Sequence, residues 1–115
     1  LISGFGNVQL LRNMGDGQFQ DETVASNLND QSWSTSTAWG DLDNDGLVDL
    51  YVAHYVNWNW ENNPSCLSPI QGQRDVCSPN EFKPLDDMIF FNNGDWTFTK
   101  KVSPERGLVV GGLGL

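Results

Sequence analysis

The sequence has few basic residues, a single histidine and no long hydrophobic run. Six Lys and Arg residues stand against fifteen Asp and Glu residues, so the formal net charge is −9. Binding to nucleic acid or to an anionic membrane surface depends on Lys and Arg, and this deficit argues against both. The longest weakly polar run, residues 107–115, is far shorter than the roughly 20 residues that a membrane-spanning helix needs. We therefore expect no nucleic-acid partner and no membrane-spanning segment in this chain.

Helical periodicity is also almost absent. Short runs with the composition of β-strands alternate instead with Gly, Asn and Asp clusters that favour turns. The runs are Val8 to Arg12, Thr35 to Trp39, Val48 to Tyr55, Met88 to Phe91 and Trp96 to Thr99. The pattern predicts an all-β fold, as a sandwich, a barrel or a propeller. Because 38% of the residues are hydrophobic, we expect a folded acidic chain, for which divalent cations are natural ligands.

The two ends of the sequence do not look like the ends of a protein. The chain opens on Leu1 without a starting Met and closes on a Gly-rich run at residues 111–115. We expect it to be a segment of a longer polypeptide, and a segment would not show a signal peptide.

An internal repeat narrows the choice of fold. Leu10 to Phe19 reappears as Ile89 to Phe98, with both the Asn and the Phe of each copy offset by 79 residues. Each copy reads as an apolar strand, an Asn-x-Gly-Asp turn and a second strand that carries Phe, as expected for a hairpin. Trp96 stands where the first copy has Gly17, so the two turns are expected to differ in type.

Residues 57–87 form a long, weakly structured stretch that holds both cysteines and four of the five prolines. In a secreted chain the default interpretation is a disulfide between Cys66 and Cys77 that closes this loop. Two free thiols in a cytosolic protein are the alternative. A zinc site with His54 as a third ligand is weaker, because a second ligand pair at finger-like spacing is missing.

The segment Asp41 to Asp49, Asp-Leu-Asp-Asn-Asp-Gly-Leu-Val-Asp, has the spacing of a calcium loop. Calcium takes six to eight oxygen ligands, and carboxylates at positions 1, 3 and 5 converge when the chain curls around the ion. These positions are Asp41, Asp43 and Asp45, and a glycine at position 6 permits the curl. Leu47 would add its backbone carbonyl and Asp49 would complete the shell. We therefore predict Ca²⁺ as the ligand.

Two other interpretations of this segment are weaker. Asp, Asn and Gly clusters also form plain turns, but four carboxylates within nine residues would repel one another without a cation. An EF-hand needs a bidentate Glu at position 12 and flanking helices. Position 12 is Val52 and both flanks have strand character, so an EF-hand is excluded.

At this point the sequence resembles a known family. Asp41 to Asp49 is similar to the D-x-D-x-D-G-x-x-D loop of FG-GAP and VCBS repeats of integrin-α-type β-propellers. The Asn-x-Gly-Asp-x-x-Phe hairpins, Trp39-Gly40, Asp49 to Ala53 and the cysteine-bearing stretch Asn63 to Pro84 resemble cartilage-acidic-protein-like, ASPIC/UnbV-associated proteins.

The resemblance implies stacked four-stranded blades around an axis, of which the chain holds roughly one and a half. We expect residues 1–28 to end one blade, 32–56 to form the calcium-loop hairpin, 57–87 to be an insertion and 88–115 to form the next hairpin.

Three classes of function come into question. The first is a non-catalytic, calcium-stabilised module that binds protein or mediates adhesion outside the cytoplasm, whether secreted, periplasmic or at the cell surface. The second is a lectin-like propeller in which Trp58 and Trp60 stack on sugars, although packing of the insertion onto the blade explains these residues as well. The third is an enzyme based on His54, Asp86 and Asp87. Adjacent acids on a strand point to opposite faces, and we expect no catalysis and His54 at a strand edge with a hydrogen-bond partner.

Overall fold

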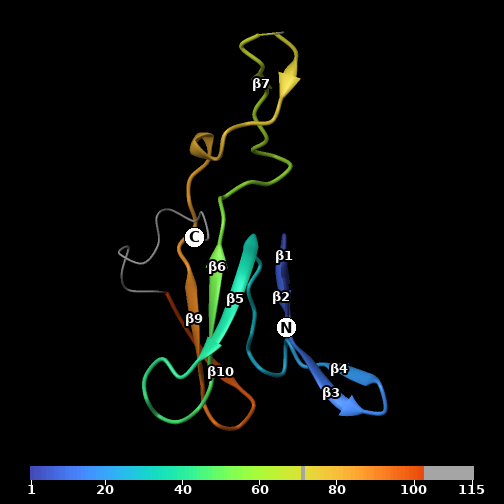
Figure 1. Ribbon diagram of the computed structural model, residues 1–115, viewed down its shortest axis with the longest axis vertical. Helices are drawn as coiled ribbons and strands as arrows, with labels where there is room; N and C mark the ends of the chain where they lie inside the picture. The colour runs from blue at the N-terminus through green and yellow to red at the C-terminus, as the bar shows by residue number, and fades with distance from the viewer. Residues whose placement is uncertain (71, 103–115) are drawn as a thin grey trace.

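The computed structural model describes residues 1–70 and 72–102. Within these residues it contains β-strands, one short 3-10 helix and no α-helix, so the predicted all-β class is confirmed (Figure 1). The elements are β1 (Ile2–Gly4), β2 (Asn7–Gln9), β3 (Leu11–Gly15), β4 (Gln18–Asp21), β5 (Ser34–Gly40), β6 (Asp49–His54), β7 (Cys66–Leu67), β8 (Arg74–Asp75), η1 (Pro79–Glu81), β9 (Met88–Asn92) and β10 (Phe98–Val102).

The centre of the molecule is a four-stranded antiparallel sheet. Its spatial order is β10-β9-β6-β5. The four strands therefore lie side by side in the same order in which they occur along the chain. The stretch 57–87 falls in the connection from β6 to β9, and β6 nevertheless pairs with β9 through Leu50 opposite Phe90. The segments 32–56 and 88–102 therefore build one sheet of the size of a propeller blade. The rest of the expected hairpin, residues 103–115, lies outside the described residues.

The first 28 residues form two small hairpins, β1–β2 and β3–β4. The prediction of a single strand from Val8 to Arg12 is wrong, because the chain changes its pairing partner at Leu10. There the backbone N–H donates to Thr23 Oγ1 at 2.9 Å. In Figure 1 the β3–β4 hairpin projects sideways from the foot of the sheet, while β1 and β2 lie beside β5.

The hydrophobic core lies between one face of the sheet and the segments that precede it. Leu50 and Val52 are two positions apart on β6, so their side chains lie on the same face of the sheet. Phe90 pairs with Leu50 on the neighbouring strand β9. These side chains are fully buried. The core cluster consists of Val8, Leu28, Leu50, Val52, Phe90 and Phe98. The β1–β2 hairpin, through Val8, and the segment around Leu28 are thus packed onto the sheet by apolar contact, as repeats in a stacked array require.

The internal repeat is confirmed by equivalent hydrogen bonds. The Oδ1 of Asn13 accepts the Gly15 N–H, and the Oδ1 of Asn92 accepts the Gly94 N–H, both at 2.9 Å. The turns differ as expected. Gly17 and its counterpart Trp96 both have positive φ, +75° and +69°, but Asp16 has φ of +51° whereas Asp95 is not among the residues with positive φ.

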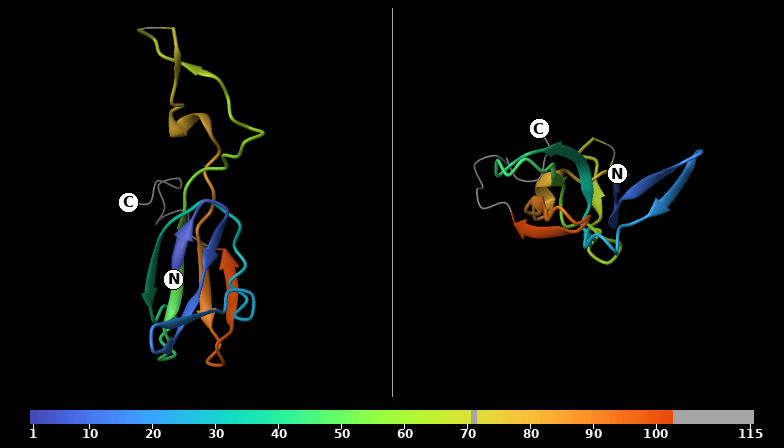
Figure 2. Two further views of the ribbon diagram at one scale, coloured as in Figure 1. Left: turned by 90° about the vertical axis from the view of Figure 1, so that its right-hand side faces the viewer. Right: turned by 90° about the horizontal axis from the view of Figure 1, so that it is seen from below.

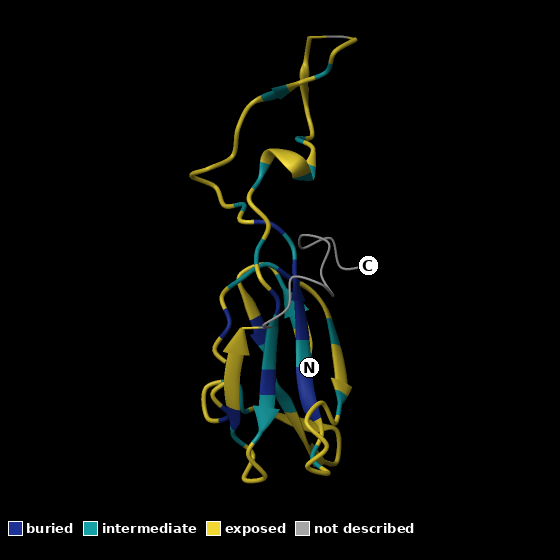
Figure 3. Cartoon of the chain, turned by 90° about the vertical axis from the view of Figure 1, so that its left-hand side faces the viewer, coloured by how far each residue is buried: buried dark blue, intermediate teal, exposed yellow. Residues whose placement is uncertain are grey.

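The insertion stands away from the sheet as a thin arm (Figure 2). The two chain segments that enter and leave the arm are joined at its base. Val56 and Pro84 form an isolated β-bridge, and the Asn57 N–H donates to the Lys83 carbonyl at 2.8 Å. Most of the arm is exposed, whereas buried residues concentrate in the sheet (Figure 3). Across the described ranges no helix is long and apolar enough to span a membrane.

Candidate metal centre

The aspartate-rich loop connects β5 to β6 at the end of the sheet opposite to the arm (Figure 1). Asp41 follows the last residue of β5, and Asp49 is the first residue of β6. Asn44 and Gly46 have φ of +63° and +88°, which Asn tolerates and Gly adopts freely. The chain therefore curls between the two strands.

Backbone N–H groups stabilise this curl by donating to the aspartate side chains. The Gly46 N–H donates to Asp41 Oδ2 at 3.0 Å, and the Asp45 N–H lies 3.2 Å from Asp41 Oδ1 and 3.3 Å from Asp43 Oδ1. The Leu47 N–H donates to Asp45 Oδ1 at 2.8 Å. The side chains thus shape the loop, and the loop in turn gathers the carboxylates.

Three of the four predicted carboxylates come together. One oxygen each from Asp41, Asp43 and Asp49 lies within 4.8 Å of the others. The carboxylate of Asp45 is outside this group and instead accepts the Leu47 N–H. Asp41 and Asp43 are exposed, whereas Asp49 is fully buried.

The gathered negative charges affect protonation. Reduced solvation and then the negative charges of Asp45, Asp49 and Asp41 raise the pKa of Asp43, and they outweigh the hydrogen bond from the Asp45 N–H. Repulsion of this kind is what a bound cation relieves.

Asn92 is a site residue that the sequence reasoning did not single out. Its backbone N–H donates to Asp49 Oδ1 at 2.8 Å, and its side-chain Nδ2 donates to the Val48 carbonyl at 3.1 Å. The Leu42 N–H donates to the other oxygen of Asp49 at 2.9 Å. Asp49 is therefore held from both sides. The internal repeat could have pointed to this residue, because Asn92 is the turn asparagine of the second copy.

The donor set fits a hard divalent cation. Asp41, Asp43 and Asp49 offer carboxylate oxygens, and Leu47 offers a backbone carbonyl in the same loop. All are oxygen donors, the kind that calcium prefers over nitrogen and sulfur. Asp45 as a fourth carboxylate ligand stays a prediction. The residues present therefore fit Ca²⁺.

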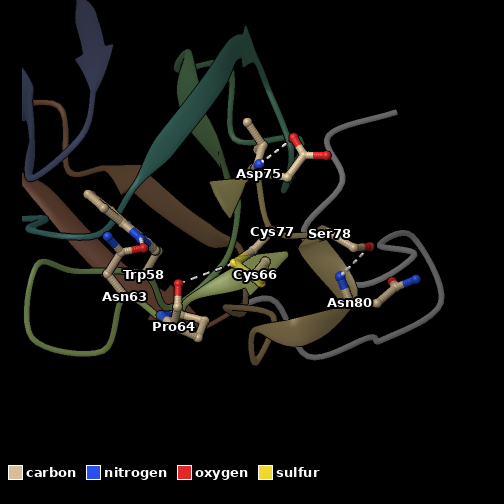
Figure 4. Close-up of a disulfide and its surroundings, with 9 residues drawn as sticks. Trp58, Asn63, Pro64, Cys66, Asp75, Cys77, Ser78 and Asn80 are labelled. Atoms are coloured by element: carbon tan, nitrogen blue, oxygen red, sulfur yellow. Dashed lines mark hydrogen bonds between the residues drawn. A yellow bond between two sulfur atoms is a disulfide. The ribbon is translucent and has the colours of Figure 1, made fainter. Parts of the chain in front are cut away.

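The cysteines of the arm are joined to each other. Cys66 and Cys77 form a disulfide with a Cα–Cα distance of 5.2 Å (Figure 4), so neither supplies a thiolate for zinc. Cys66 pairs with Asp75 in the short β7–β8 ladder, which continues with Leu67 opposite Arg74. Cys77 Sγ also lies 3.4 Å from the carbonyl oxygen of Pro64, a contact rather than a hydrogen bond because a disulfide sulfur carries no proton.

The two tryptophans of the arm differ in environment. Trp58 is half-buried and packs against Phe5 and Trp33, with ring centroids 5.2 and 5.7 Å apart. Trp33 in turn packs edge-on against Tyr55 at 5.1 Å. Trp60 is 79% exposed and contacts Trp58 at 4.9 Å. Trp58 therefore packs the arm onto the sheet, and Trp60 covers its outer side.

His54 lies in a buried polar cluster at the base of the arm. It is fully buried at the end of the central strand β6, so the expectation that it lies at a strand edge is wrong. Its Nε2 is 2.6 Å from Asp30 Oδ2, and its Nδ1 is 2.6 Å from the Asp86 carbonyl oxygen. Asp87 accepts hydrogen bonds from the His54 backbone N–H and from the hydroxyl of Tyr51. Three segments are thereby tied together.

The charges in this cluster follow from the geometry. Both ring nitrogens of His54 face acceptors, so the imidazolium form, in which both nitrogens donate, satisfies both contacts. Burial lowers the pKa of His54. The hydrogen bonds to Asp30 and Asp86 and the negative charges of Asp30 and Asp87 raise it by more, so that the pKa lies above its usual value. Burial raises the pKa of Asp30, but hydrogen bonds from His54 and Ser32 and the imidazolium charge lower it to about 2. Burial, with the hydrogen bond to Asp87, raises the pKa of Tyr51 to about 12.

Sheet, loop and repeat together define an all-β repeat module. Residues 1–52 match the family model described as the FG-GAP-like repeat. The matched segment begins before β1 and extends into β6, and it includes the whole aspartate loop. It supports an FG-GAP repeat in this part of the chain, and the predicted fold class of β-propeller blades is confirmed. No curated protein and no solved structure matches the chain.

Proposed function

We propose that the chain is a non-catalytic, calcium-binding repeat module of an extracellular, periplasmic or cell-surface protein. In this role calcium makes the blade a rigid scaffold for protein binding or adhesion. The observation that carries the proposal is the convergence of Asp41, Asp43 and Asp49 in a loop shaped by backbone N–H donors. All the donors are oxygens, and their like charges oppose folding of the loop in the absence of a cation.

The residues of the site have distinct tasks in this proposal. Asp41 and Asp43 supply charge at the exposed side, and Asp49 links the site to the sheet through the N–H groups of Leu42 and Asn92. When bound, calcium neutralises the carboxylates. Because Asp49 begins β6 and Asn92 ends β9, the loop is then tied to two central strands.

The parent protein is proposed to be an integrin-α-like propeller of the cartilage-acidic-protein-like, ASPIC/UnbV-associated type. The FG-GAP-like match over residues 1–52 supports the repeat type. The finer assignment rests on the resemblance of the hairpins and of the cysteine-bearing arm. A location outside the cytoplasm is supported by the disulfide between Cys66 and Cys77, since such bonds persist in oxidising compartments.

A non-catalytic role is proposed from the chemistry of the titratable groups. The hydrogen-bond contacts of His54 are to Asp30, Asp86 and Asp87, and it is fully buried, so a substrate has no access to it. Asp87 is likewise buried, with contacts to Tyr51 and His54. These groups explain the attachment of the arm without a reaction.

Thermal unfolding with and without calcium tests the scaffold role. Extracellular modules bind calcium with Kd of about 10⁻⁴–10⁻³ M, so at about 1 mM calcium the tighter limit stabilises the fold by about 1.4 kcal/mol per site. For a domain of this size the expected gain in Tm over a chelator is roughly 5–10 °C.

The matched variants sharpen this test. Asp43→Asn should lose the calcium-dependent gain, whereas Asp16→Asn, at an exposed turn aspartate of the β3–β4 hairpin, should keep it. An identical Tm in calcium and in chelator for the unsubstituted protein would contradict the proposal.

A further inference from the structure

The arm is joined to the sheet by two chain segments that are held in different ways. In the outgoing segment, which follows β6, the Tyr55 N–H donates to the Trp33 carbonyl at 2.9 Å, and the Trp58 ring packs against Phe5 and Trp33. Aromatic packing buries apolar surface and a backbone hydrogen bond carries no net charge, so neither depends on protonation. The outgoing segment is therefore attached by contacts that are insensitive to pH.

The returning segment, residues 83–87, carries no aromatic residue, and hydrogen bonds hold it. The Leu85 N–H donates to the Tyr55 carbonyl at 3.1 Å, and the Lys83 carbonyl accepts the Asn57 N–H at 2.8 Å. These two bonds pair the returning segment with the outgoing one. Its next two residues then meet His54 at the end of β6, so the attachment of this segment to the sheet passes through a group that titrates.

His54 joins the returning segment to the segment that precedes β5. Its Nδ1 lies 2.6 Å from the Asp86 carbonyl oxygen, and its Nε2 lies 2.6 Å from Asp30 Oδ2. The ring is fully buried, so water does not replace either partner. An imidazolium donates from both nitrogens, whereas a neutral imidazole has a single N–H. Both contacts are therefore hydrogen bonds only while the ring carries its second proton.

Loss of the second proton affects the two contacts unequally. The carboxylate of Asp30 is charged and the Asp86 carbonyl is not, so the remaining proton is favoured on Nε2, where the hydrogen bond is charge-assisted. The lone pair of Nδ1 then faces the Asp86 carbonyl oxygen at 2.6 Å, and two acceptors at this distance repel each other. The repulsion acts on the returning segment of the arm, whereas Asp30 keeps its partner.

The other titratable groups around the ring stay as they are during this step. Asp87 faces His54 from the returning segment and accepts the His54 backbone N–H at 2.8 Å, and Tyr51 on β6 donates its hydroxyl to Asp87. Burial and the hydrogen bond to Asp87 raise the pKa of Tyr51 to about 12, well above the range of histidine. Neither donor to Asp87 is lost when the ring becomes neutral, so Asp87 remains fixed as a pivot for residues 83–86.

We propose that His54 is a proton-dependent latch for the arm. With two protons its ring closes the base of the arm against β6, and with one proton it releases residues 83–86 while the sheet, the outgoing segment and Asp87 stay in place. Burial lowers the pKa of His54, but its hydrogen bonds to Asp30 and Asp86 outweigh burial and raise it. The latch is therefore closed below about pH 6.5 and opens as the pH rises through the folded-state pKa.

Hydrogen exchange of the full chain at saturating calcium, measured by NMR from about pH 5 to about pH 10, tests the latch. The single histidine reports the protonation state of the ring in the same samples. We expect the Leu85 and Asn57 amides to lose about tenfold or more in protection factor as the ring loses its proton, since one buried hydrogen bond is lost. The Tyr55 amide of the outgoing segment and the Phe98 amide, which donates to the Ser26 carbonyl, should keep their protection.

Two variants separate the latch from a general effect of charge. Asp86→Asn replaces an exposed side chain and retains the backbone carbonyl that contacts the ring, so the pH of release should stay nearly unchanged. Asp30→Asn removes the charge that stabilises the imidazolium, so the titration of the ring and the loss of Leu85 protection should both move to lower pH by about one unit or more. If Asp30→Asn does not fold, the unsubstituted protein and Asp86→Asn still decide the question.

Three results would overturn the proposal. The first is a ring that keeps one protonation state over the whole pH range. The second is loss of the proton without loss of protection at Leu85 and Asn57. The third is an equal loss of protection at Tyr55 and Phe98, because the proton would then affect only the stability of the whole fold and not the attachment of the arm.

Discussion

Asp49 and Asp43 belong to the same loop but are held in opposite ways. Asp49 is fully buried and accepts N–H groups from Leu42 and Asn92, whereas Asp43 is exposed and surrounded by like charges. At the residue scale, one carboxylate therefore stabilises the fold by itself and the other has a favourable role only with a cation.

This contrast gives a prediction for the protein in chelator. Asp49→Ala should lower the free energy of unfolding by about 2–4 kcal/mol, because two backbone donors lose their buried acceptor. Asp43→Ala should change it far less, because the Asp43 side chain is exposed and no buried donor depends on it. Urea unfolding of both variants measures the difference, and equal losses would show that Asp49 is not the structural anchor.

His54 and Asp30 give the fold a dependence on pH. The raised pKa of His54 means that its stabilisation is fully present below about pH 6.5 and is lost as the pH rises through the folded-state pKa. The lowered pKa of Asp30 means that its stabilisation is present above about pH 3.8 and is lost as the pH falls towards 2. The pair therefore stabilises the fold most between these limits.

We predict that the free energy of unfolding, at saturating calcium, falls on the alkaline side and that His54→Gln removes this fall. The variant should also cost about 3–5 kcal/mol at pH 6, because it leaves Asp30 buried without its partner. Since the chain has a single histidine, its NMR signals can be followed without ambiguity. A neutral imidazole at pH 6 in the folded protein would refute the assignment.

At the scale of elements, the turn between β9 and β10 is packed against the aspartate loop. Gly94 has φ of +80°, and a Cβ at this position would lie 3.3 Å from Leu47 Cδ1. The turn therefore depends on glycine for both its backbone conformation and its closeness to the loop.

Gly94→Ala should lower the free energy of unfolding by about 1–2 kcal/mol, because an L-residue is strained in this region. Gly4→Ala is the matched control, since its backbone is not left-handed and no atom lies within 4 Å of the added carbon. Chemical denaturation of both variants tests the prediction. Equal effects of the two substitutions would contradict it.

The strands of the sheet were predictable because each carries its own signal. Leu50 and Val52 alternate along β6, and the repeated Asn-x-Gly-Asp turn marks the β9–β10 hairpin. The division of Val8–Arg12 into β2 and β3 was not predictable, because it depends on the distant hydroxyl of Thr23. Trp96 was expected in a strand but lies in the turn, where its left-handed backbone replaces that of Gly17.

The candidate site was predictable to a similar degree. The spacing of the loop identified its aspartates, whereas the link from Asn92 to Asp49 requires two strands that are adjacent only in the folded sheet. The pairing of His54 with Asp30 had no local signal either. It joins two segments 24 residues apart, and neither residue stands in a recognisable motif.

At the scale of the whole molecule, the sheet separates two regions with different chemistry. The aspartate loop lies at one end, and the arm lies at the other (Figure 1). The buried cluster around His54 joins the arm to the sheet, and Asp49 joins the loop to it.

The central claim is that the loop from Asp41 to Asp49 binds calcium, and calorimetric titration of the full chain with Ca²⁺ tests it most directly. We predict saturable binding with a Kd of about 10⁻⁴–10⁻³ M, lost in Asp43→Asn and retained in Asp16→Asn. The absence of saturable heat in the unsubstituted protein, or the same titration curve in Asp43→Asn, would show that the aspartates only form a turn.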